Sequence, residues 1–277
     1  ISSGEGTRHL AAKAAERALA AAGVAPEELD IIILGTSSPD RNYPSDACSV
    51  QAAIGAVNAV AFDISAACAG FIFAMNIVEG FFKAGIYKTA LIIGAETLSK
   101  VTDWSDRSTC VLFGDGAGAA VLKAEETGII DMMMGADGTK GDVLACTSRT
   151  VGNFLTGTKP ELGFMTMDGQ EVFKFAVRKV PESVMELLQR TGTKKEDIKY
   201  YVLHQANERI IEAAARRLKE PMEKFPMTIG QFGNTSTASI PLLLDDMIQK
   251  DMLKRGDKII MSGFGAGMTW GAVLMEW

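Results

Sequence analysis

Cys68 combines a reactive side chain with a position that suits nucleophilic chemistry. It stands in the run Phe62-Asp-Ile-Ser-Ala-Ala-Cys-Ala-Gly-Phe71, where a strand-like segment gives way to a long apolar helix. A cysteine at a helix N-terminus experiences the positive end of the helix dipole, which favours the thiolate, the reactive form. The alternative interpretation is an inert buried cysteine, which is the commoner fate of this residue type.

Two further side chains could assist such a nucleophile. His204 follows the strand-like run Tyr200-Tyr-Val-Leu203, at the edge where open α/β sheets bind their ligands. Asn234 lies in Phe232-Gly-Asn-Thr-Ser236, immediately before a predicted helix. Each also has a structural interpretation, as a buried histidine with its hydrogen bonds satisfied and as a helix N-cap.

Metal and dinucleotide chemistry receive little support. The chain has only two histidines, and its four cysteines form no CxxC pair, so no zinc site is expected. The glycine runs 114–118 and 263–267 lack the spacing of a dinucleotide motif and lead into strands rather than into a helix. The second run instead predicts a tight turn whose N–H groups are directed into a pocket.

The composition is ordinary for a globular protein, and the four scattered cysteines predict a cytoplasmic location. Apolar residues make up 47% of the chain and charged residues 22%, and the net charge is −6 without any Lys/Arg-rich run. This balance argues against nucleic acid or an anionic membrane as the main partner. The longest apolar run, 66–78, is too short to cross a bilayer.

The sequence repeats itself at a constant offset. Gly23-Val-Ala-Pro-Glu-Glu-Leu-Asp-Ile-Ile-Ile-Leu34 matches Gly192-Thr-Lys-Lys-Glu-Asp-Ile-Lys-Tyr-Tyr-Val-Leu203, 169 positions later, and Gly94 matches Gly263 at the same offset. Each copy predicts a helix, a glycine stop, an acidic turn and a buried strand. We therefore predict two similar halves, residues 1–127 with Cys68 and residues 128–277 with His204 and Asn234, and a site at their interface.

Alternating helices and strands predict mostly parallel sheets covered by helices, once in each half. The stretch 137–166, rich in Gly and Thr, is expected to be a long functional loop. The predicted helices are 7–22, 67–83, 168–190, 207–218 and 236–249. The predicted strands are 30–35, 89–94, 117–123, 198–203, 257–262 and 269–276.

Taken together, the motifs resemble the β-ketoacyl-acyl carrier protein synthase III family of the thiolase-like superfamily. The matching segments, in the order of the family, are Ser65-Ala-Ala-Cys-Ala-Gly-Phe71, Phe113-Gly-Asp-Gly-Ala-Gly-Ala119, His204-Gln-Ala-Asn207, Gly233-Asn-Thr-Ser236 and Gly263-Phe-Gly-Ala-Gly-Met-Thr-Trp-Gly271. The resemblance implies an α/β, thiolase-like duplicated αβαβα five-layer fold and a homodimer that carries no cofactor. Elongating synthases use a Cys-His-His triad, and thiolases use a second catalytic cysteine near the C-terminus. Both fit less well, because the only other histidine, His9, lies in the first predicted helix and the last cysteine is Cys146.

The resemblance also implies a ping-pong reaction that initiates fatty acid synthesis, with Cys68, His204 and Asn234 as the catalytic residues. Cys68 would take the acyl group from acyl-coenzyme A. Malonyl-acyl carrier protein would then lose CO₂ while His204 and Asn234 donate hydrogen bonds to its thioester oxygen. The backbone N–H groups of Cys68 and Ala266 would form the oxyanion hole of the acyl transfer.

Binding residues are implied in the same way. Arg107 and Phe173 correspond to the coenzyme A entrance, Asn207 to the pantetheine channel, and Lys174 and Arg209 to basic positions that receive the acidic carrier protein. An ordinary solvated charge is the alternative for these basic residues. The family's first strand and an N-terminal Trp and Arg that contact the nucleotide have no counterpart in 1–277.

Tyr43 corresponds to a loop that crosses the dimer interface and caps the partner's acyl pocket. A bulky ring there favours a short primer such as acetyl-coenzyme A, whereas the alternative is a tyrosine that only packs in the interface.

Two other functions stay open at this point. One is a synthase III relative that condenses other acyl groups, or forms esters or amides, in secondary metabolism. The other is a non-catalytic thiolase-fold partner subunit, which the presence of Cys68, His204 and Asn234 disfavours.

Overall fold

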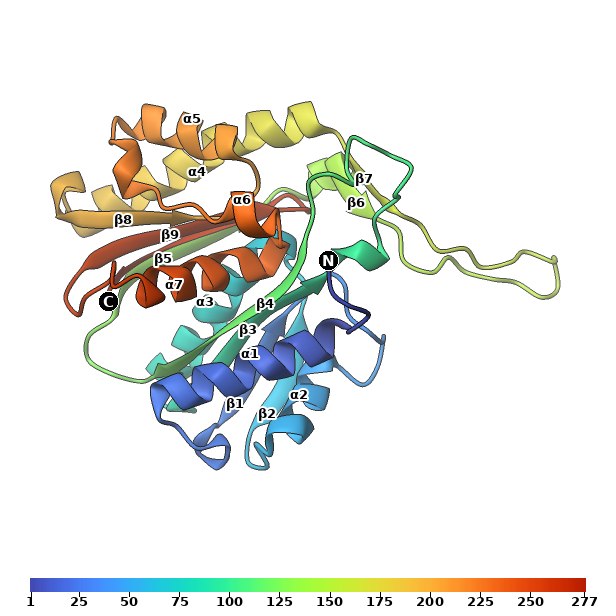
Figure 1. Ribbon diagram of the computed structural model, residues 1–277, viewed down its shortest axis with the longest axis horizontal. Helices are drawn as coiled ribbons and strands as arrows, with labels where there is room; N and C mark the ends of the chain where they lie inside the picture. The colour runs from blue at the N-terminus through green and yellow to red at the C-terminus, as the bar shows by residue number, and fades with distance from the viewer.

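Two four-stranded sheets lie on either side of a central helical layer in the computed structural model, which describes residues 1–277 (Figure 1). The first sheet has the strand order β2-β1-β3-β4 and the second has the order β5-β10-β9-β8. The strands of the first sheet are β1 (Ile31–Gly35), β2 (Val60–Ile64), β3 (Thr89–Thr97) and β4 (Asp115–Lys123). Those of the second are β5 (Ile129–Ala136), β8 (Ile198–Leu203), β9 (Lys258–Gly265) and β10 (Thr269–Glu276).

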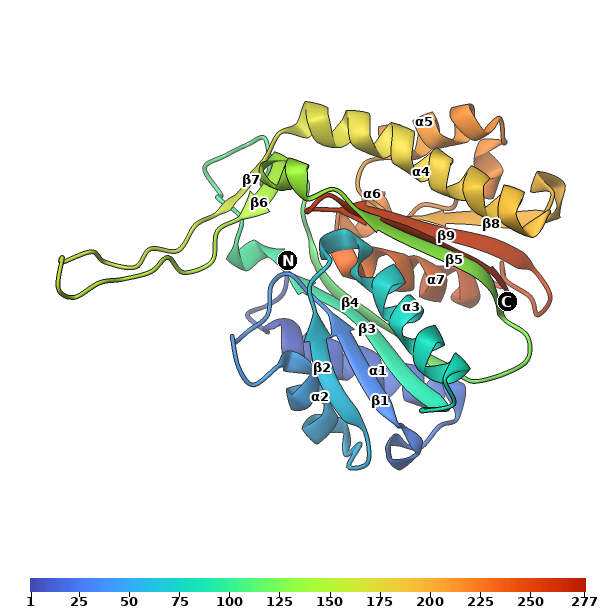
Figure 2. The same cartoon turned by 180° about the vertical axis from the view of Figure 1, so that it is seen from behind.

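Helices form the other three layers (Figures 1 and 2). The central layer contains α3 (Gly70–Lys83) and α7 (Ser239–Gln249). The outer face of the first sheet is covered by α1 (Thr7–Ala22) and α2 (Asp46–Ile54), and that of the second by α4 (Gly169–Thr191) and α5 (Glu208–Leu218). A further short helix, α6 (Ile229–Phe232), precedes α7. None of the helices combines the length and apolarity needed to span a bilayer.

The apolar core follows this layering. Side chains alternate along β1, so that Ile31 and Ile33 pack into the central layer while Ile32 and Leu34 pack under α1 and α2. Both faces of the strand are covered, which explains its continuous apolar sequence. The central cluster also takes in Val202 and other residues of the second sheet, so the two halves share one core.

The duplication is visible in the elements themselves. The helices α1 and α4 end at Ala22 and Thr191, 169 positions apart, and each is followed by a glycine with positive φ, as the sequence predicts. Two short 3₁₀ turns that precede the central helices, η2 (Ala67–Ala69) and η7 (Ser236–Ala238), obey the same offset. The predicted division at 127/128 lies in the connection from β4 to β5.

Three sequence predictions need correction. The sheets are not mostly parallel, because β3–β4, β9–β10 and β5–β10 pair antiparallel. The short turn between β9 and β10 is too short for a parallel crossover, which requires a dozen or more residues. Second, α2 and β5 are missing from the predicted elements, and β2 is anticipated only as the strand-like segment before Cys68.

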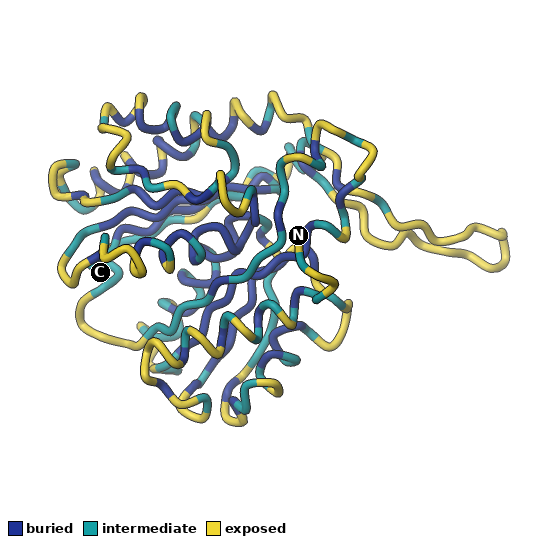
Figure 3. Tube along the Cα trace, viewed as in Figure 1, coloured by how far each residue is buried: buried dark blue, intermediate teal, exposed yellow.

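The third correction concerns the loop 137–166, which contains a 3₁₀ segment and a small hairpin of β6 (Leu144–Cys146) and β7 (Met165–Met167). The segment that connects β6 to β7 extends away from the rest of the molecule as an exposed arm (Figures 2 and 3).

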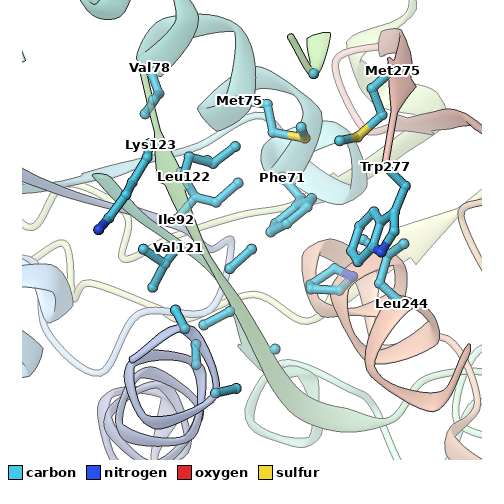
Figure 4. A pocket seen from close by; sticks show the side chains of 18 of the residues that line it. Phe71, Met75, Val78, Ile92, Val121, Leu122, Lys123, Leu244, Met275 and Trp277 are labelled. Carbon is cyan, nitrogen blue, oxygen red and sulfur yellow. The ribbon is translucent and has the colours of Figure 1, made fainter. Parts of the chain in front are cut away.

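An apolar groove of about 1200 Å³ runs along β4, which has no strand on its outer side. Phe71 and Met75 of α3, Val121 of β4, Leu244 of α7 and the C-terminal Trp277 line it (Figure 4). Cys68, His204 and Asn234 are absent from its lining. This groove is therefore separate from the residues that could perform chemistry.

Gly94 of β3 tests how closely the halves must approach. A Cβ atom on Gly94 would collide with the backbone carbonyl oxygen of Thr237 in η7. We expect Gly94→Ala to lower the free energy of unfolding by about 1–3 kcal/mol through overpacking. Urea denaturation measures the effect.

Gly80 provides the matched control, because it lies inside α3 with open space around its Cα. Gly80→Ala should raise stability by about 0.4–1 kcal/mol, since alanine restricts the unfolded chain. Equal effects of the two substitutions would contradict a tight contact at Gly94.

Candidate active site

Cys68 lies in η2, the turn that joins β2 to α3, and is 7% exposed. The residue before it, Ala67, has a φ of 44°, which is unusual for a residue other than glycine. Ser236, at the equivalent position of η7, has a φ of 49°. Such conformations persist only where the surrounding structure enforces them, and they cluster at functional sites. Both turns therefore mark the junction of the two halves as a candidate site.

The end of β9 packs directly against Cys68. A Cβ atom on Gly265 would lie 2.5 Å from the backbone nitrogen of Cys68, and one on Gly263 would lie 3.4 Å from its carbonyl oxygen. These glycines thus permit a close approach rather than binding a dinucleotide. The next residue, Ala266, keeps a backbone N–H without a hydrogen-bond acceptor in the chain.

His204 lies just after β8, beside the same end of β9. Its backbone N–H donates to the carbonyl oxygen of Ser262 at 2.8 Å, and its ring meets that of Phe264 edge-on at 5.5 Å between centroids. The Nδ1 atom is 2.6 Å from the hydroxyl oxygen of Ser239. His204 is 2% exposed, and this burial lowers its pKa to about 3. The imidazole is therefore neutral at physiological pH.

Asn234 is held by the first half of the chain. Its backbone N–H donates to the carbonyl oxygen of Leu112 and its carbonyl oxygen accepts from Gly114, each at 2.9 Å. Its side-chain Oδ1 accepts the N–H of Ser236 at 2.9 Å. This bond orients the amide and leaves the Nδ2 hydrogens as its available donors. Asn234 is not the N-cap of η7, which is Thr235, so the capping interpretation is wrong, and the amide nitrogen is not used by the turn.

The thiol of Cys68 is electrostatically unlike the predicted thiolate. Burial raises the pKa of Cys68 to about 12, a hydrogen bond with Ser236 lowers it, and the negative charge of Glu96 raises it. The helix N-terminus favours the thiolate, but it does not decide the resting state of Cys68. Loss of hydration outweighs the favourable dipole when the sulfur is enclosed.

Glu96, which sequence reasoning missed, connects the two halves beside Cys68. It is fully buried near the end of β3, and no Lys, Arg or His side chain forms an ion pair with it. Its carboxylate accepts hydrogen bonds at 2.5–3.2 Å from the hydroxyl groups of Thr36, Ser37, Ser38, Ser236 and Thr237. The sequence did contain a signal for this contact. Glu96 is a charged residue directly after the apolar run 90–95, and the hydroxyl-bearing run Thr36-Ser-Ser38 follows another buried strand.

Ser236 contacts both Glu96 and Cys68, and it can give its hydrogen to only one of them. The Ser236 hydroxyl donates to Oε1 of Glu96 at 3.0 Å, and a hydrogen bond from the same hydroxyl to the sulfur lowers the pKa of Cys68. A serine has one hydroxyl hydrogen. While the ionised Glu96 holds that hydrogen, a thiolate at Cys68 lacks this donor.

The other predicted residues lie at two outer regions. Tyr43 and Arg107 are exposed in loops of the first half, and the Tyr43 side chain is 86% exposed. The other four lie at the N-terminal ends of the neighbouring helices α4 and α5: Phe173, Lys174, Asn207 and Arg209. Asn207 caps α5 by accepting the N–H of Arg209 at 2.9 Å, and Lys174 pairs with Glu171 at 2.8 Å.

Two family models match the chain. The 3-oxoacyl-[acyl-carrier-protein (ACP)] synthase III family matches residues 62–138, and the C-terminal part of the same family matches residues 188–277. The curated β-ketoacyl-[acyl-carrier-protein] synthase III of Clostridium acetobutylicum is 50% identical over 100% of this chain and 86% of the relative. The protein of the same name from Clostridium novyi is 51% identical with the same coverage.

Solved structures agree with these matches. The 3-oxoacyl-[acyl-carrier-protein] synthase III of Aquifex aeolicus aligns with a TM-score of 0.92 at 45% identity, covering 100% of this chain and 86% of that protein. The priming β-ketosynthase of the R1128 polyketide pathway aligns with a TM-score of 0.89 at 34% identity, covering 100% and 84%. The predicted thiolase-like five-layer fold is confirmed.

Removing the charge of Glu96 should make Cys68 more reactive. In Glu96→Gln the thiolate no longer faces a buried negative charge, so the pKa of Cys68 falls. Below the pKa, each unit of decrease raises the thiolate fraction, and hence the alkylation rate, about tenfold. We expect iodoacetamide to modify the Cys68 peptide roughly tenfold faster at pH 8, as measured by mass spectrometry.

Two variants control this experiment. Glu96→Asp keeps the charge and should not show the acceleration, and Glu125→Gln removes an exposed charge and should leave the rate unchanged. A slower reaction in Glu96→Gln than in the unmodified protein would show that Glu96 activates Cys68 instead.

Proposed function

Since the chain belongs to the 3-oxoacyl-[acyl-carrier-protein] synthase III family, we propose that it initiates fatty acid synthesis by condensing an acyl group from acyl-coenzyme A with malonyl-acyl carrier protein. The products are 3-oxoacyl-acyl carrier protein, CO₂ and coenzyme A. The observation that carries the proposal is a buried cysteine at the junction of the halves, with a neutral histidine and an oriented asparagine on the elements around it.

In the first step, the sulfur of Cys68 attacks the thioester carbonyl of acyl-coenzyme A. The S–C bond forms as the thiol loses its proton, and the coenzyme A thiolate leaves and is protonated. The pKa of about 12 means that little thiolate exists beforehand, so proton loss accompanies attack. The N–H groups of Cys68 and Ala266 are proposed to stabilise the tetrahedral oxyanion. The N–H of Ala266 supports this role, because it has no hydrogen-bond acceptor in the chain.

In the second step, the malonyl thioester loses CO₂ and its enolate carbon attacks the acyl-Cys68 carbonyl. The C–C bond forms, the S–C bond to Cys68 breaks, and the released thiolate takes up a proton from solvent to regenerate the thiol. His204 and Asn234 are proposed to donate hydrogen bonds to the enolate oxygen. The fixed amide of Asn234 supports this role, because its Nδ2 hydrogens have no protein acceptor.

Substrate delivery is proposed to use the N-terminal ends of α4 and α5. Lys174 and Arg209 would receive the acidic carrier protein, while Phe173, Asn207 and Arg107 would contact coenzyme A and pantetheine. The exposure of both basic side chains supports this role. The ion pair of Lys174 with Glu171 screens part of its charge, so Arg209 is expected to contribute more.

The chain is further proposed to act as a homodimer that prefers a short acyl primer. The 86% exposure of Tyr43 in the single chain supports a position in which a second copy covers the ring. In that arrangement Tyr43 would cap the partner's acyl pocket and limit the length of the primer.

A secondary-metabolic activity remains the second candidate, because the R1128 priming ketosynthase shares the fold. Its identity of 34%, against 50% for the Clostridium acetobutylicum relative, favours fatty acid synthesis.

The half-reactions separate the roles of the three proposed catalytic residues. Intact mass after mixing with acetyl-coenzyme A should show one acetyl group on Cys68, and Cys68→Ala should acquire none. His204→Ala should still be acylated, but its release of CO₂ from malonyl-acyl carrier protein should fall about 10²–10³-fold, because one donor to the enolate is lost. Normal decarboxylation without acylation would contradict this assignment.

Shortening Tyr43 should broaden primer choice. With Tyr43→Ala, turnover on longer acyl-coenzyme A primers should rise relative to acetyl-coenzyme A, because room for a methylene is worth about 1–3 kcal/mol in discrimination. Turnover measured against acyl length for the two proteins gives the answer. An unchanged length profile would leave Tyr43 as an interface residue only.

A further inference from the structure

Ser239, the first residue of α7, hydrogen-bonds with His204 through its side chain. Its hydroxyl oxygen lies 2.6 Å from Nδ1 of His204 and accepts the backbone N–H of Gln205 at 3.3 Å. The serine is 2% exposed, so water does not compete freely for these bonds. The same hydroxyl therefore contacts the histidine ring and the backbone that carries it.

A count of hydrogens assigns the direction of the bond to His204. The N–H of Gln205 can only donate, so it occupies a lone pair of the Ser239 oxygen. The single hydroxyl hydrogen then has Nδ1 as its acceptor in the chain. In the opposite arrangement Nδ1–H would donate to the serine, and the hydroxyl hydrogen would be buried without an acceptor, which is unfavourable.

Helix capping does not explain this serine. The start of α7 has no side-chain cap, and the hydroxyl of Ser239 accepts no N–H of its own helix. At the equivalent position of the first half, 169 residues earlier, α3 begins with Gly70, which has no side chain. A central helix can thus begin here without a hydroxyl group, so the fold alone does not require one.

We propose that Ser239 is a positioning residue that fixes His204 in the tautomer with hydrogen on Nε2. This inference rests on the proposed function, in which His204 meets the malonyl thioester. With the hydrogen on Nε2, the neutral ring is a hydrogen-bond donor to the enolate oxygen and not a base for Cys68. Ser239 thereby makes His204 a hydrogen-bond donor for the decarboxylation step.

Nuclear magnetic resonance of protein labelled with ¹⁵N-histidine tests the tautomer directly. The chain has only two histidines, and the exposed His9 provides a reference signal that His9→Gln identifies. We expect Nε2 of His204 to be protonated and Nδ1 to be bare, unchanged between pH 5 and 8 because its pKa is about 3. A ring protonated on Nδ1 in the unmodified protein overturns the proposal.

Ser239→Ala tests the consequence. Without the hydroxyl the ring loses both its tautomer bias and the bond that holds it in place, so decarboxylation of malonyl-acyl carrier protein should fall about tenfold or more, the equivalent of one buried hydrogen bond. Acetylation of Cys68 should fall less, and Ser239→Thr, which keeps the hydroxyl, should restore decarboxylation. Equal losses in both half-reactions, or no rescue by threonine, overturn the proposal.

The experiments distinguish a failure of the tautomer assignment from a failure of the proposed function. If no acyl-coenzyme A acylates Cys68 while Nε2 of His204 is protonated, the proposed function fails and the role of Ser239 in setting the tautomer stands. If Ser239→Ala does not fold, the spectra of the unmodified protein and of Ser239→Thr still decide the tautomer.

Discussion

The hydrogen bonds to the buried carboxylate of Glu96 hold together the junction on which the candidate site depends. Hydroxyl groups from the first half, Thr36 to Ser38, and from the second half, Ser236 and Thr237, converge on this one charge. A buried charge without a counter-ion is costly unless several donors satisfy it. The carboxylate therefore has all its donors only when the two halves pack in this one arrangement, and the same arrangement places η2 beside η7.

Enclosure decides the electrostatics of the site that results. The same burial raises the pKa of Cys68 and lowers that of His204, so the resting pair is a thiol and a neutral imidazole. An uncharged pair avoids the cost of placing an ion pair in a medium of low dielectric constant. Donors aimed at charge that appears only during the reaction are then more effective than they would be in water. The site is suited to stabilising a transient oxyanion rather than a permanent thiolate.

Duplication explains why the site lies between the halves. The two central turns are equivalent structures, because they lie 169 positions apart and share a positive φ at Ala67 and Ser236. They have diverged in chemistry, since one presents a thiol and the other an asparagine and hydroxyl groups. The apolar groove along β4 is lined by neither Cys68 nor Asn234 (Figure 4). An apolar groove therefore does not by itself identify the functional site in this protein.

The sequence by itself determined the elements that depend on local patterns. The glycine stops after α1 and α4, the buried strands and the 169-residue offset all follow from periodicity and backbone preference, which neighbouring residues set. The positions of Cys68, His204 and Asn234 at element ends could be predicted for the same reason. Their proposed roles came from family resemblance.

Only the tertiary structure decided the protonation states and the connections between distant residues. The pKa of Cys68 depends on desolvation and on Glu96, which approaches from another strand, so the favourable dipole inferred from local sequence does not decide the direction of the net shift. The direction of the Ser239–His204 hydrogen bond likewise depends on three groups brought together by folding. Hydration and hydrogen-bond partners are set by what surrounds a residue in space, which the order of residues along the chain does not state.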